Sequence, residues 1–379
     1  MTILPVFSRS NTRMKSVFCF FCILVLSLPY SGSAQVTGGQ YAFEYLLMSN
    51  SPHVSALGGI VPASNDPDVT FTLQNPGLLQ DKMHNQLAIG YNNYYAGISI
   101  ANLQYAYQVP QLHTTFALGI QYLNYGKFDQ TDLFGNILGE VRASDFSINL
   151  SAARTYKQHW QYGATLKFAY SHLADRNAFA ILADVGVAYV DTANLLVVGI
   201  VGKNMGVTLD RYYSGATAEP LPFDLQFGIS KQLKNVPLRL FMAAHHLYQW
   251  DIRYNNPADK VNDNFFGTDD SSAVKEKSYF ADKLFRHLNF GAELTLARRV
   301  TLTAAYSHLH RSELAASDRK GLAGFSLGVG VHLSKIQVRY SRTYFTTAGA
   351  YNEIGFAFQL NKFFGIGNKT TPWGWNASY

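Results

Sequence analysis

Residues 160–171 read WQYGATLKFAYS, a run in which large apolar or aromatic side chains alternate with small or polar ones. Successive side chains of an extended strand point to opposite faces, so Tyr162 and Leu166 share one face and Gln161 and Lys167 share the other. The outer face of a soluble sandwich would carry many Lys and Glu residues, whereas the polar face here is mostly small and uncharged. The pattern therefore predicts a strand whose apolar face meets lipid and whose polar face lines a lumen.

The same period-2 alternation recurs from Gln86 to Leu360 and defines fourteen segments. An even number of strands is expected of a single-chain barrel in the bacterial outer membrane. The predicted fold class is therefore all-β: a 14-stranded antiparallel transmembrane β-barrel of the outer membrane, preceded by an N-terminal hatch or plug segment. The expected strands span residues 86–92, 97–108, 114–125, 144–154, 160–171, 182–190, 195–203, 222–231, 237–248, 286–297, 300–309, 322–333, 335–344 and 351–360.

The connections between these segments alternate in length. Those after even-numbered segments are short, such as 109–113 and 298–299, and those after odd-numbered segments are longer, up to residues 249–285. Outer-membrane barrels have short periplasmic turns and long extracellular loops. We therefore expect residues 249–285 to lie outside the cell and the N-terminus to lie in the periplasm.

The composition is apolar and aromatic without long apolar runs. Of the 379 residues, 47% are hydrophobic and 14% are aromatic, whereas 15% are charged, against about 25% in an average soluble domain. This apolar content argues against a disordered chain. Beyond the N-terminal leader, no stretch reaches the roughly 18 consecutive apolar residues that a membrane-spanning helix needs.

The N-terminus has the features of a secretory signal peptide. A basic segment that ends at Lys15 precedes the apolar stretch 17–28, and small residues then lead to a cleavage site after Ala34. Removal of residues 1–34 would also remove both cysteines, so the mature chain is expected to have no disulfide or thiolate site. The mature chain keeps 28 Lys and Arg against 25 Asp and Glu, a net charge of +3 that indicates no nucleic-acid partner.

Residues 35–85 do not alternate and are punctuated by glycine and proline. We expect turns and a short helix in a segment that lies in the periplasm or plugs the lumen, with a flexible leader as the alternative. The domain organisation is then a plug over 35–85, a barrel over 86–360 and a C-terminal periplasmic tail over 361–379. The residues expected to form the plug turns are Gly58, Gly59, Asp66, Asn75, Pro76 and Gly77.

Motifs for catalysis are weak. Ser317 and Lys320 match a Ser-x-x-Lys pattern, but they lie in a hydrophilic stretch, and the chain lacks the Lys-Thr-Gly strand that this chemistry needs. His245 and His246 adjoin on a predicted strand, so their rings are expected to point to opposite faces and not to bind one metal together. We therefore expect a protein that is not an enzyme and has no catalytic residues, no cofactor and no metal site.

Residues 249–285 form the longest connection and hold seven acidic and five basic residues. Asp263, Asp269 and Asp270 offer carboxylates, but they lack the regular ligand spacing of a Ca²⁺ loop, which favours a solvated loop. Aromatic side chains among charges are typical of protein interfaces. We therefore expect this loop to bind a surface partner, and its candidate contact residues are Trp250, Tyr254, Phe265, Phe266 and Tyr279.

Two parts of the chain resemble known families. Residues 56–59 (ALGG), Asp66 and residues 74–79 (QNPGLL) resemble the hatch of FadL-like outer-membrane barrels, with Gly77 where that group usually has alanine. Residues 119–132 (GIQYLNYGKFDQTD) look like the PorQ family of the type IX secretion system of Bacteroidota.

The second resemblance implies a non-enzymatic barrel, embedded in outer-membrane lipid, in the complex that attaches secreted cargo to lipopolysaccharide. It implies a PorZ-like surface partner held near a PorU-like sortase and its PorV-like carrier, and it leaves direct contact with lipopolysaccharide open. The alternative is a FadL-like channel for the uptake of hydrophobic small molecules, which the hatch and the strand number fit equally well.

Overall fold

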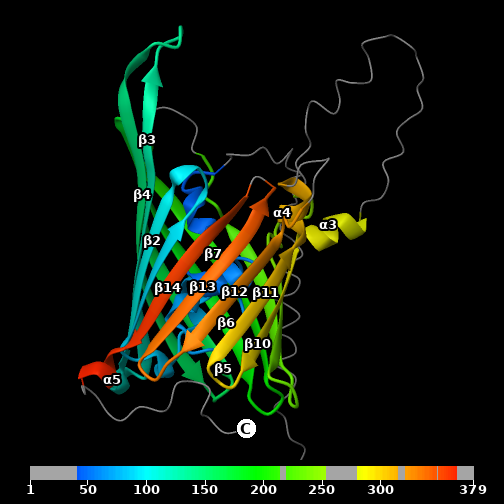
Figure 1. Ribbon diagram of the computed structural model, residues 1–379. Helices are drawn as coiled ribbons and strands as arrows, with labels where there is room; N and C mark the ends of the chain where they lie inside the picture. The colour runs from blue at the N-terminus through cyan, green and yellow to red at the C-terminus, as the bar shows by residue number, and fades with distance from the viewer. Residues whose placement is uncertain (1–40, 214–218, 253–279, 315–320, 348, 365–379) are drawn as a thin grey trace, which may run out of the picture. The chain divides into compact units, whose positions relative to one another are not determined.

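The computed structural model describes the chain with gaps, over residues 41–213, 219–252, 280–314, 321–347 and 349–364. The predicted signal peptide and most of the predicted C-terminal tail lie outside these ranges. Fourteen antiparallel strands form one closed barrel, in which consecutive strands pair and β1 pairs with β14 (Figure 1). The predicted fold class is therefore confirmed.

The strands are β1 (Gln86–Asn93), β2 (Ser99–Val109), β3 (Thr114–Thr131), β4 (Ile137–Tyr156), β5 (Trp160–Leu173), β6 (Arg176–Asp191), β7 (Leu196–Asp210), β8 (Asp224–Gln232), β9 (Leu238–Ala244), β10 (Leu288–Leu296), β11 (Val300–Ser307), β12 (Phe325–His332), β13 (Ile336–Thr346) and β14 (Gly349–Gln359). Short α-helices are α2 (Pro52–Ala56), α3 (Phe280–Arg286), α4 (His308–Glu313) and α5 (Leu360–Phe364). Short 3-10 helices are η1 (Glu44–Leu47), η2 (Val69–Leu73), η3 (Pro76–Leu78), η4 (Asp81–Met83), η5 (Tyr95–Gly97) and η6 (Pro110–Leu112). None of the helices in the described ranges combines the length and the apolar character needed to cross a membrane.

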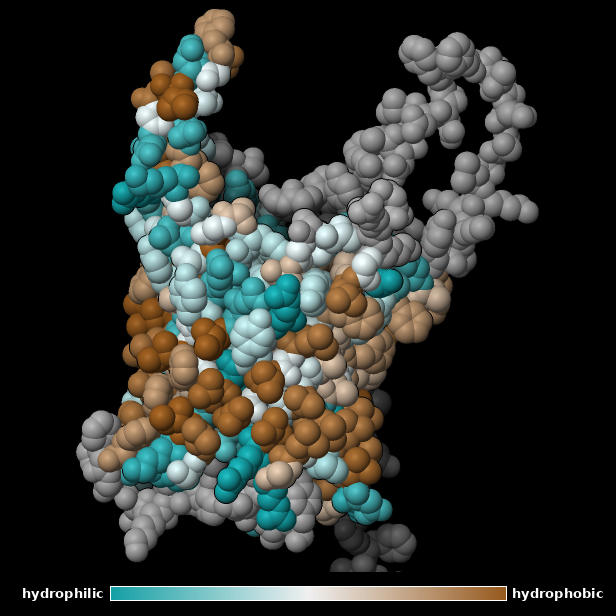
Figure 2. Space-filling model, in the orientation of Figure 1, coloured by the Kyte–Doolittle hydropathy of each residue, from teal (hydrophilic) through white to brown (hydrophobic). Residues whose placement is uncertain are grey.

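The barrel wall is apolar outside and polar inside. On β5, Tyr162 and Leu166 are 46% and 42% exposed on the outer wall, whereas Thr165 and Lys167 are buried in the lumen. Figure 2 shows apolar side chains gathered in a band around the visible wall, with more polar side chains above it. Apolar outward faces and polar inward faces are what a bilayer requires of a spanning barrel, so the fold is that of integral outer-membrane proteins.

Two of the predicted long loops are instead extended hairpins. β3 and β4 stay paired as far as Thr131 and Ile137, and β5 and β6 are joined by only two residues, Ala174 and Asp175. The alternation does not predict these extensions because backbone pairing continues where the apolar face of the strand ends. Alternation in side-chain polarity reflects contact with lipid, so it does not reveal strand pairing that continues outside the membrane.

Strand β9 is shorter than predicted. It ends at Ala244 and not at residue 248, because His246 adopts a left-handed φ of 52° that interrupts the extended backbone. The two residues after Ala244 therefore leave the alternation of the strand.

Residues 41–85 lie inside the barrel (Figure 1). The first of them are at the end of the barrel that carries the long connections, where the Tyr41 hydroxyl bonds to the Tyr248 hydroxyl (3.0 Å) and the Ala42 N–H donates to the Pro220 carbonyl (3.0 Å). The chain then runs down the lumen to β1 at the end with the short turns. The N-terminus was predicted to lie in the periplasm. Residues 35–40 lie outside the described ranges, and the described plug begins at the opposite, long-loop end.

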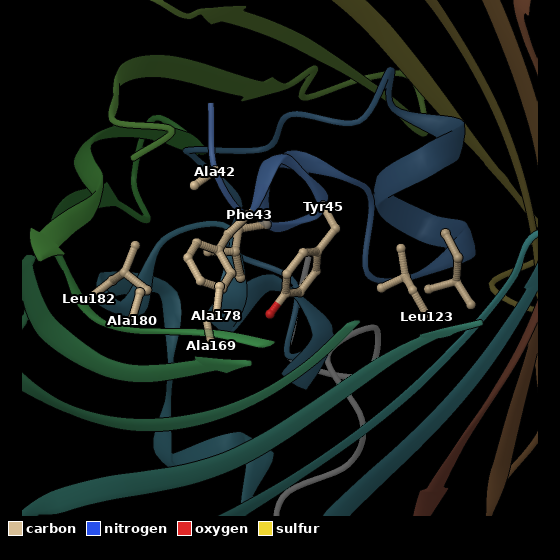
Figure 3. Packing of buried hydrophobic residues seen from close by; sticks show 10 residues of the cluster. Ala42, Phe43, Tyr45, Leu123, Ala169, Ala178, Ala180 and Leu182 are labelled. Carbon is tan, nitrogen blue, oxygen red and sulfur yellow. The ribbon is translucent and has the colours of Figure 1, made fainter. Parts of the chain in front are cut away.

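The plug packs on the wall in three apolar layers. Near the long-loop end, Phe43 and Tyr45 pack on small side chains of the wall such as Ala169 and Ala178 (Figure 3). In the middle layer, Phe71 and Leu78 belong to a cluster with wall residues of β6 and β7. The layer nearest the short turns contains Val69, Leu79, Met83, Ala88, Ala106, Ala117, Ala153 and Ala357.

Candidate functional site

The turn at Asn75 anchors the plug. The Asn75 side-chain oxygen accepts the N–H of Gly77 (2.8 Å), and its amide nitrogen donates to the carbonyl of Pro62 (2.7 Å). Asn75, Pro76 and Gly77 are buried, and a Cβ on Gly77 would lie 3.0 Å from the carbonyl oxygen of Gly186 on β6. The structure therefore places the predicted turn residues together, in the interior of the barrel.

The other predicted turn residues also lie in the plug. Gly58 and Gly59 both have a φ of +88°, a left-handed conformation that favours glycine. The Gly58 carbonyl accepts a hydrogen bond from Asn289 of β10 (3.1 Å). Asp66 is buried and pairs with Arg239 of β9. Gly58 and Asp66 thus connect the plug to the wall.

A set of wall glycines fits the plug closely. Each lies on the lumen side of a different strand, and a Cβ in its place would contact plug atoms at 2.5 Å for Gly163 and 2.8 Å for Gly355, closer than real Cβ contacts allow. Glycine is frequent on the polar strand faces of the sequence, but the alternation does not predict this role. The glycines, each with the plug residue that its Cβ would meet, are Gly163 (Pro76), Gly186 (Asn75), Gly199 (Pro62), Gly228 (Pro62), Gly328 (Ala56) and Gly355 (Pro52).

A buried ionic cluster, which we call the ionic lock, joins the plug to the wall. His53 of α2 bonds through Nδ1 to Asp68 (2.8 Å) and through Nε2 to Glu293 of β10 (2.9 Å). Arg239 of β9 pairs with Asp66, and its Nη1 lies 3.6 Å from Oε1 of Glu293. Because the partners come from the plug and from two strands, the cluster fixes the plug against one side of the lumen.

Arg339 of β13 completes the ionic lock, with its Nε 3.7 Å from Oδ2 of Asp68. Burial and Arg339 act to lower the pKa of His53, but hydrogen bonds to Asp68 and Glu293 outweigh them and raise that pKa above its usual value. Burial acts to raise the pKa of Asp68, yet the bond from His53 and the charge of Arg339 hold it well below its usual range. The ionic lock thus brings His53 and two arginines together with three carboxylates.

Little space remains between plug and wall at this point. The cavity beside the ionic lock, between α2, η2 and strands β1, β2, β13 and β14, has a volume of about 20 Å³. A cavity of this size holds about one water molecule. At this point, therefore, the plug and the wall are in close contact.

The β3–β4 hairpin projects beyond the rim of the barrel (Figure 1). At its end, the Asp132 carboxylate accepts the N–H groups of Phe134 (2.9 Å) and Asn136 (2.8 Å), which shapes the turn. Lys127 and Glu140 form an exposed ion pair (2.5 Å) lower on the same hairpin.

Four apolar side chains of this turn are exposed, and we call them the hairpin tip. Leu133 is 102% exposed and Phe134 is 91% exposed, and Figure 2 shows the apolar end standing above a polar part of the hairpin. Residues 119–132, the stretch with the family resemblance, include most of the first strand of this hairpin, and the apolar turn that follows was not predicted as a site. The hairpin tip consists of Leu133, Phe134, Ile137 and Leu138.

The predicted partner loop is described only at its ends. Trp250 is 46% exposed and stacks on His287, with ring centroids 5.8 Å apart. Tyr254, Phe265, Phe266 and Tyr279 lie outside the described residues, as do Asp263, Asp269 and Asp270 and the Ser317–Lys320 motif.

The structure contradicts the expectation that His245 and His246 point apart. Their Nδ1 atoms lie 2.6 Å from each other, because the left-handed φ of His246 turns its side chain back toward that of its neighbour. Ligand atoms of Asp224, His245 and His246 all lie within 4.8 Å of one another. Nothing in the alternation of the sequence signals this break in the strand.

Comparisons with known proteins find similarity in fold. No protein-family model matches the chain, and no curated protein matches it. Among solved structures, the toluene transporter TbuX of Ralstonia pickettii has a TM-score of 0.47 at 13% identity, over 83% of this chain and 98% of that one. A deletion mutant of the monoaromatic hydrocarbon channel TodX has a TM-score of 0.49 at 12% identity, over 82% and 98% of the two chains. A Pseudomonas aeruginosa FadL homologue has a TM-score of 0.40 at 11% identity, over 79% and 99%.

Proposed function

We propose that this protein is a plugged outer-membrane barrel that acts as a docking scaffold at the cell surface. Its role would be that of the type IX secretion family which residues 119–132 resemble. The observation that carries the proposal is the projecting β3–β4 hairpin with its apolar tip. On this view the hairpin tip binds a surface protein of the PorZ kind and holds it near a PorU-like sortase and its PorV-like carrier. Lipopolysaccharide of the surrounding membrane is a further candidate contact.

The chemistry of the hairpin favours a protein partner over lipid. Single apolar side chains are common on protein surfaces, but a contiguous group of large exposed ones usually marks an interaction site. Burial on a partner would contribute about 1.5–3 kcal/mol for each fully covered side chain. Charged residues such as Lys127, Asp129 and Glu140 lie between the hairpin tip and the apolar band of the barrel, so the hairpin tip cannot enter the same bilayer without also burying charges.

The lumen supports the same proposal. A transporter needs a route past its plug, whereas here glycines, the ionic lock and three apolar layers hold the plug on the wall. A scaffold has no such need, because its plug serves only to keep the barrel closed and rigid. The tight fit of the plug is thus expected of a protein that binds its partner at the rim and passes no solute through the lumen.

The second candidate is a FadL-like channel for hydrophobic small molecules. The solved structures with a similar fold are named as a toluene transporter, a monoaromatic hydrocarbon channel and a FadL homologue, and none of these three is named as a secretion protein. The feature of this chain that favours the candidate is an apolar hollow of about 540 Å³ on the wall at β8 to β12. Leu240, Met242 and Phe290 line this hollow, where a hydrocarbon could rest.

A variant of the hairpin tip separates the two candidates. We would replace Leu133, Phe134, Ile137 and Leu138 with Ser and purify the barrel from native outer membranes together with its partners. The scaffold proposal expects normal heat-modifiable migration, at least a tenfold loss of the co-eluting surface protein and impaired display of secreted proteins. A Lys127→Gln/Glu140→Gln variant of the same hairpin is the control and should keep the partner.

The opposite result would favour transport. If the tip variant keeps its partner and display, the docking role is wrong. If, in addition, deletion of the protein abolishes toluene uptake and the tip variant fully restores that uptake, the channel function replaces the docking proposal.

A further inference from the structure

The backbone after β9 is held in a fixed bend at the long-loop end of the barrel. The N–H of His245 donates to the carbonyl of His287 (3.0 Å), and the ring of His287 bonds back to the carbonyl of His245 (2.8 Å). The N–H of His246 donates to Oδ1 of Asp224, the first residue of β8 (2.6 Å). The bend therefore holds both histidine side chains beside the Asp224 carboxylate.

The two rings meet through nitrogen atoms. With 2.6 Å between the Nδ1 atoms of His245 and His246, at most one proton lies between them, so at least one nitrogen presents a lone pair. His245 is 2% exposed, and among the described residues its Nε2 has no hydrogen-bond partner. A buried imidazole with one unpartnered nitrogen and another facing a second imidazole is incompletely satisfied by protein atoms.

We propose that Asp224, His245 and His246 bind a divalent transition-metal ion of the Zn²⁺ class. Two imidazole nitrogens and one carboxylate oxygen are a ligand set of catalytic or open zinc sites, in which a fourth position stays free for water or another ligand. Ligand atoms of a tetrahedral zinc ion lie about 3.3 Å apart, from a metal–nitrogen distance of about 2.0–2.1 Å. The ligand atoms of the present cluster all lie within 4.8 Å of one another, so on binding an ion the side chains would adjust around it.

The surroundings orient the carboxylate and moderate the affinity. Gln226 donates to Oδ2 of Asp224 (2.7 Å), the kind of outer hydrogen bond that fixes a metal-binding carboxylate. Lys203 of β7 lies opposite Asp224 in the strand register and adds a positive charge. We therefore expect an exchangeable ion, bound more weakly than in a closed structural zinc site.

The position of the site indicates what the ion does. Residues 245–287 form the connection between β9 and β10, and His245 and His246 are its first residues. Two residues later, the Tyr248 hydroxyl contacts the Tyr41 hydroxyl at the start of the described plug. A bound ion would thus join β8 to the first residues of this connection, two residues before the contact between Tyr248 and the plug. This inference does not depend on whether the barrel is a scaffold or a channel.

The test uses the full chain, purified in detergent with a tag that contains no histidine and stripped with EDTA. We expect calorimetric titration with Zn²⁺ to give one ion per chain, and Co²⁺ to give the visible absorption band of a nitrogen-and-oxygen-ligated site. His246→Gln, which keeps the backbone N–H bonded to Asp224, should weaken binding at least tenfold and abolish the band. Asp224→Asn should do the same in barrels that still show heat-modifiable migration.

His172→Gln is the matched control, because His172 is a half-buried histidine of β5 at the same end of the barrel and lies outside the cluster. It should bind Zn²⁺ and Co²⁺ as the parent chain does. The proposal is overturned if the parent binds no ion, or if His246→Gln binds with the same stoichiometry and affinity as the parent, which would show adventitious binding only.

Discussion

The lumen and the rim of this barrel differ in how closely their side chains are packed. In the lumen, the charges of the ionic lock are buried and paired, and glycines remove even a methyl group where the plug approaches the wall. At the rim, the β3–β4 hairpin leaves Leu133 and Phe134 almost fully in water. A chain that fits its interior so closely has no packing reason to leave such side chains uncovered. This difference is expected if the interior maintains the structure and if, as we propose, the rim binds a partner.

The strongest way to break this comparison is to remove a buried charge from the lumen. Glu293→Gln would leave His53 and Arg239 without their shared carboxylate, and loss of one partner of a buried pair costs about 3–5 kcal/mol. We expect a lower unfolding midpoint in detergent and greater protease access to the plug. Glu140→Gln, which removes an exposed ion pair on the hairpin, should change stability by less than about 1 kcal/mol. Equal effects of the two changes would contradict the ionic lock.

A second change adds a side chain at a position where the plug leaves no free space beside the wall. In Gly186→Val the new side chain would collide with Asn75, and overpacking of this kind costs about 1–3 kcal/mol. Gly139→Val on the hairpin is the control, because nothing lies within 4 Å of its Cβ. Limited proteolysis should release fragments of residues 41–85 from the first variant and leave the second unchanged. An undisturbed plug in Gly186→Val would show that the glycine fit is not required.

The ionic lock should also depend on pH. Because the pKa of His53 is raised in the folded state, its stabilisation is fully present below the unfolded value of 6.5 and is lost as pH rises through the folded value. The lowered pKa of Asp68 keeps its own contribution present above its unfolded value of 3.8. Unfolding midpoints measured upward from pH 6 should therefore fall in the parent. The slope should be smaller in His53→Gln, and identical slopes would refute the role of this histidine.

The smallest effect on stability is expected at the rim. Replacing Phe134 with Ser removes a side chain that contacts water, so the free energy of unfolding should change by no more than about 0.5 kcal/mol. The same substitution should weaken capture of the surface partner. A large loss of stability in the purified barrel would mean that the hairpin tip packs on the barrel itself.

The sequence predicts the barrel well because lipid imposes a regular pattern on every spanning strand. The alternation around Tyr162 and Leu166 located β5 closely, and the same held for most other strands. The pattern could not show the β3–β4 extension, which stands outside the membrane. It also could not show the bend at His246, which depends on the φ of one residue.

The plug was recognisable as a segment, but its attachments were not. His53 and Glu293 are 240 residues apart in the chain, and no sequence motif predicts that they are in contact. Glycines such as Gly163 and Gly228 were visible on the polar strand faces, yet their meaning depends on which plug residue lies opposite. Long-range pairs of this kind follow from the closed topology, which brings the plug and the strands together.

The most direct test of the scaffold account places a photo-crosslinking amino acid at position 134 in living cells. The same probe at position 166, on the outer wall of β5, is the control because that side chain faces the apolar band. The account predicts a protein adduct at position 134 that contains a surface protein of the secretion machinery, and lipid adducts alone at position 166. Absence of any protein adduct at position 134, in cells that display secreted proteins normally, would contradict it.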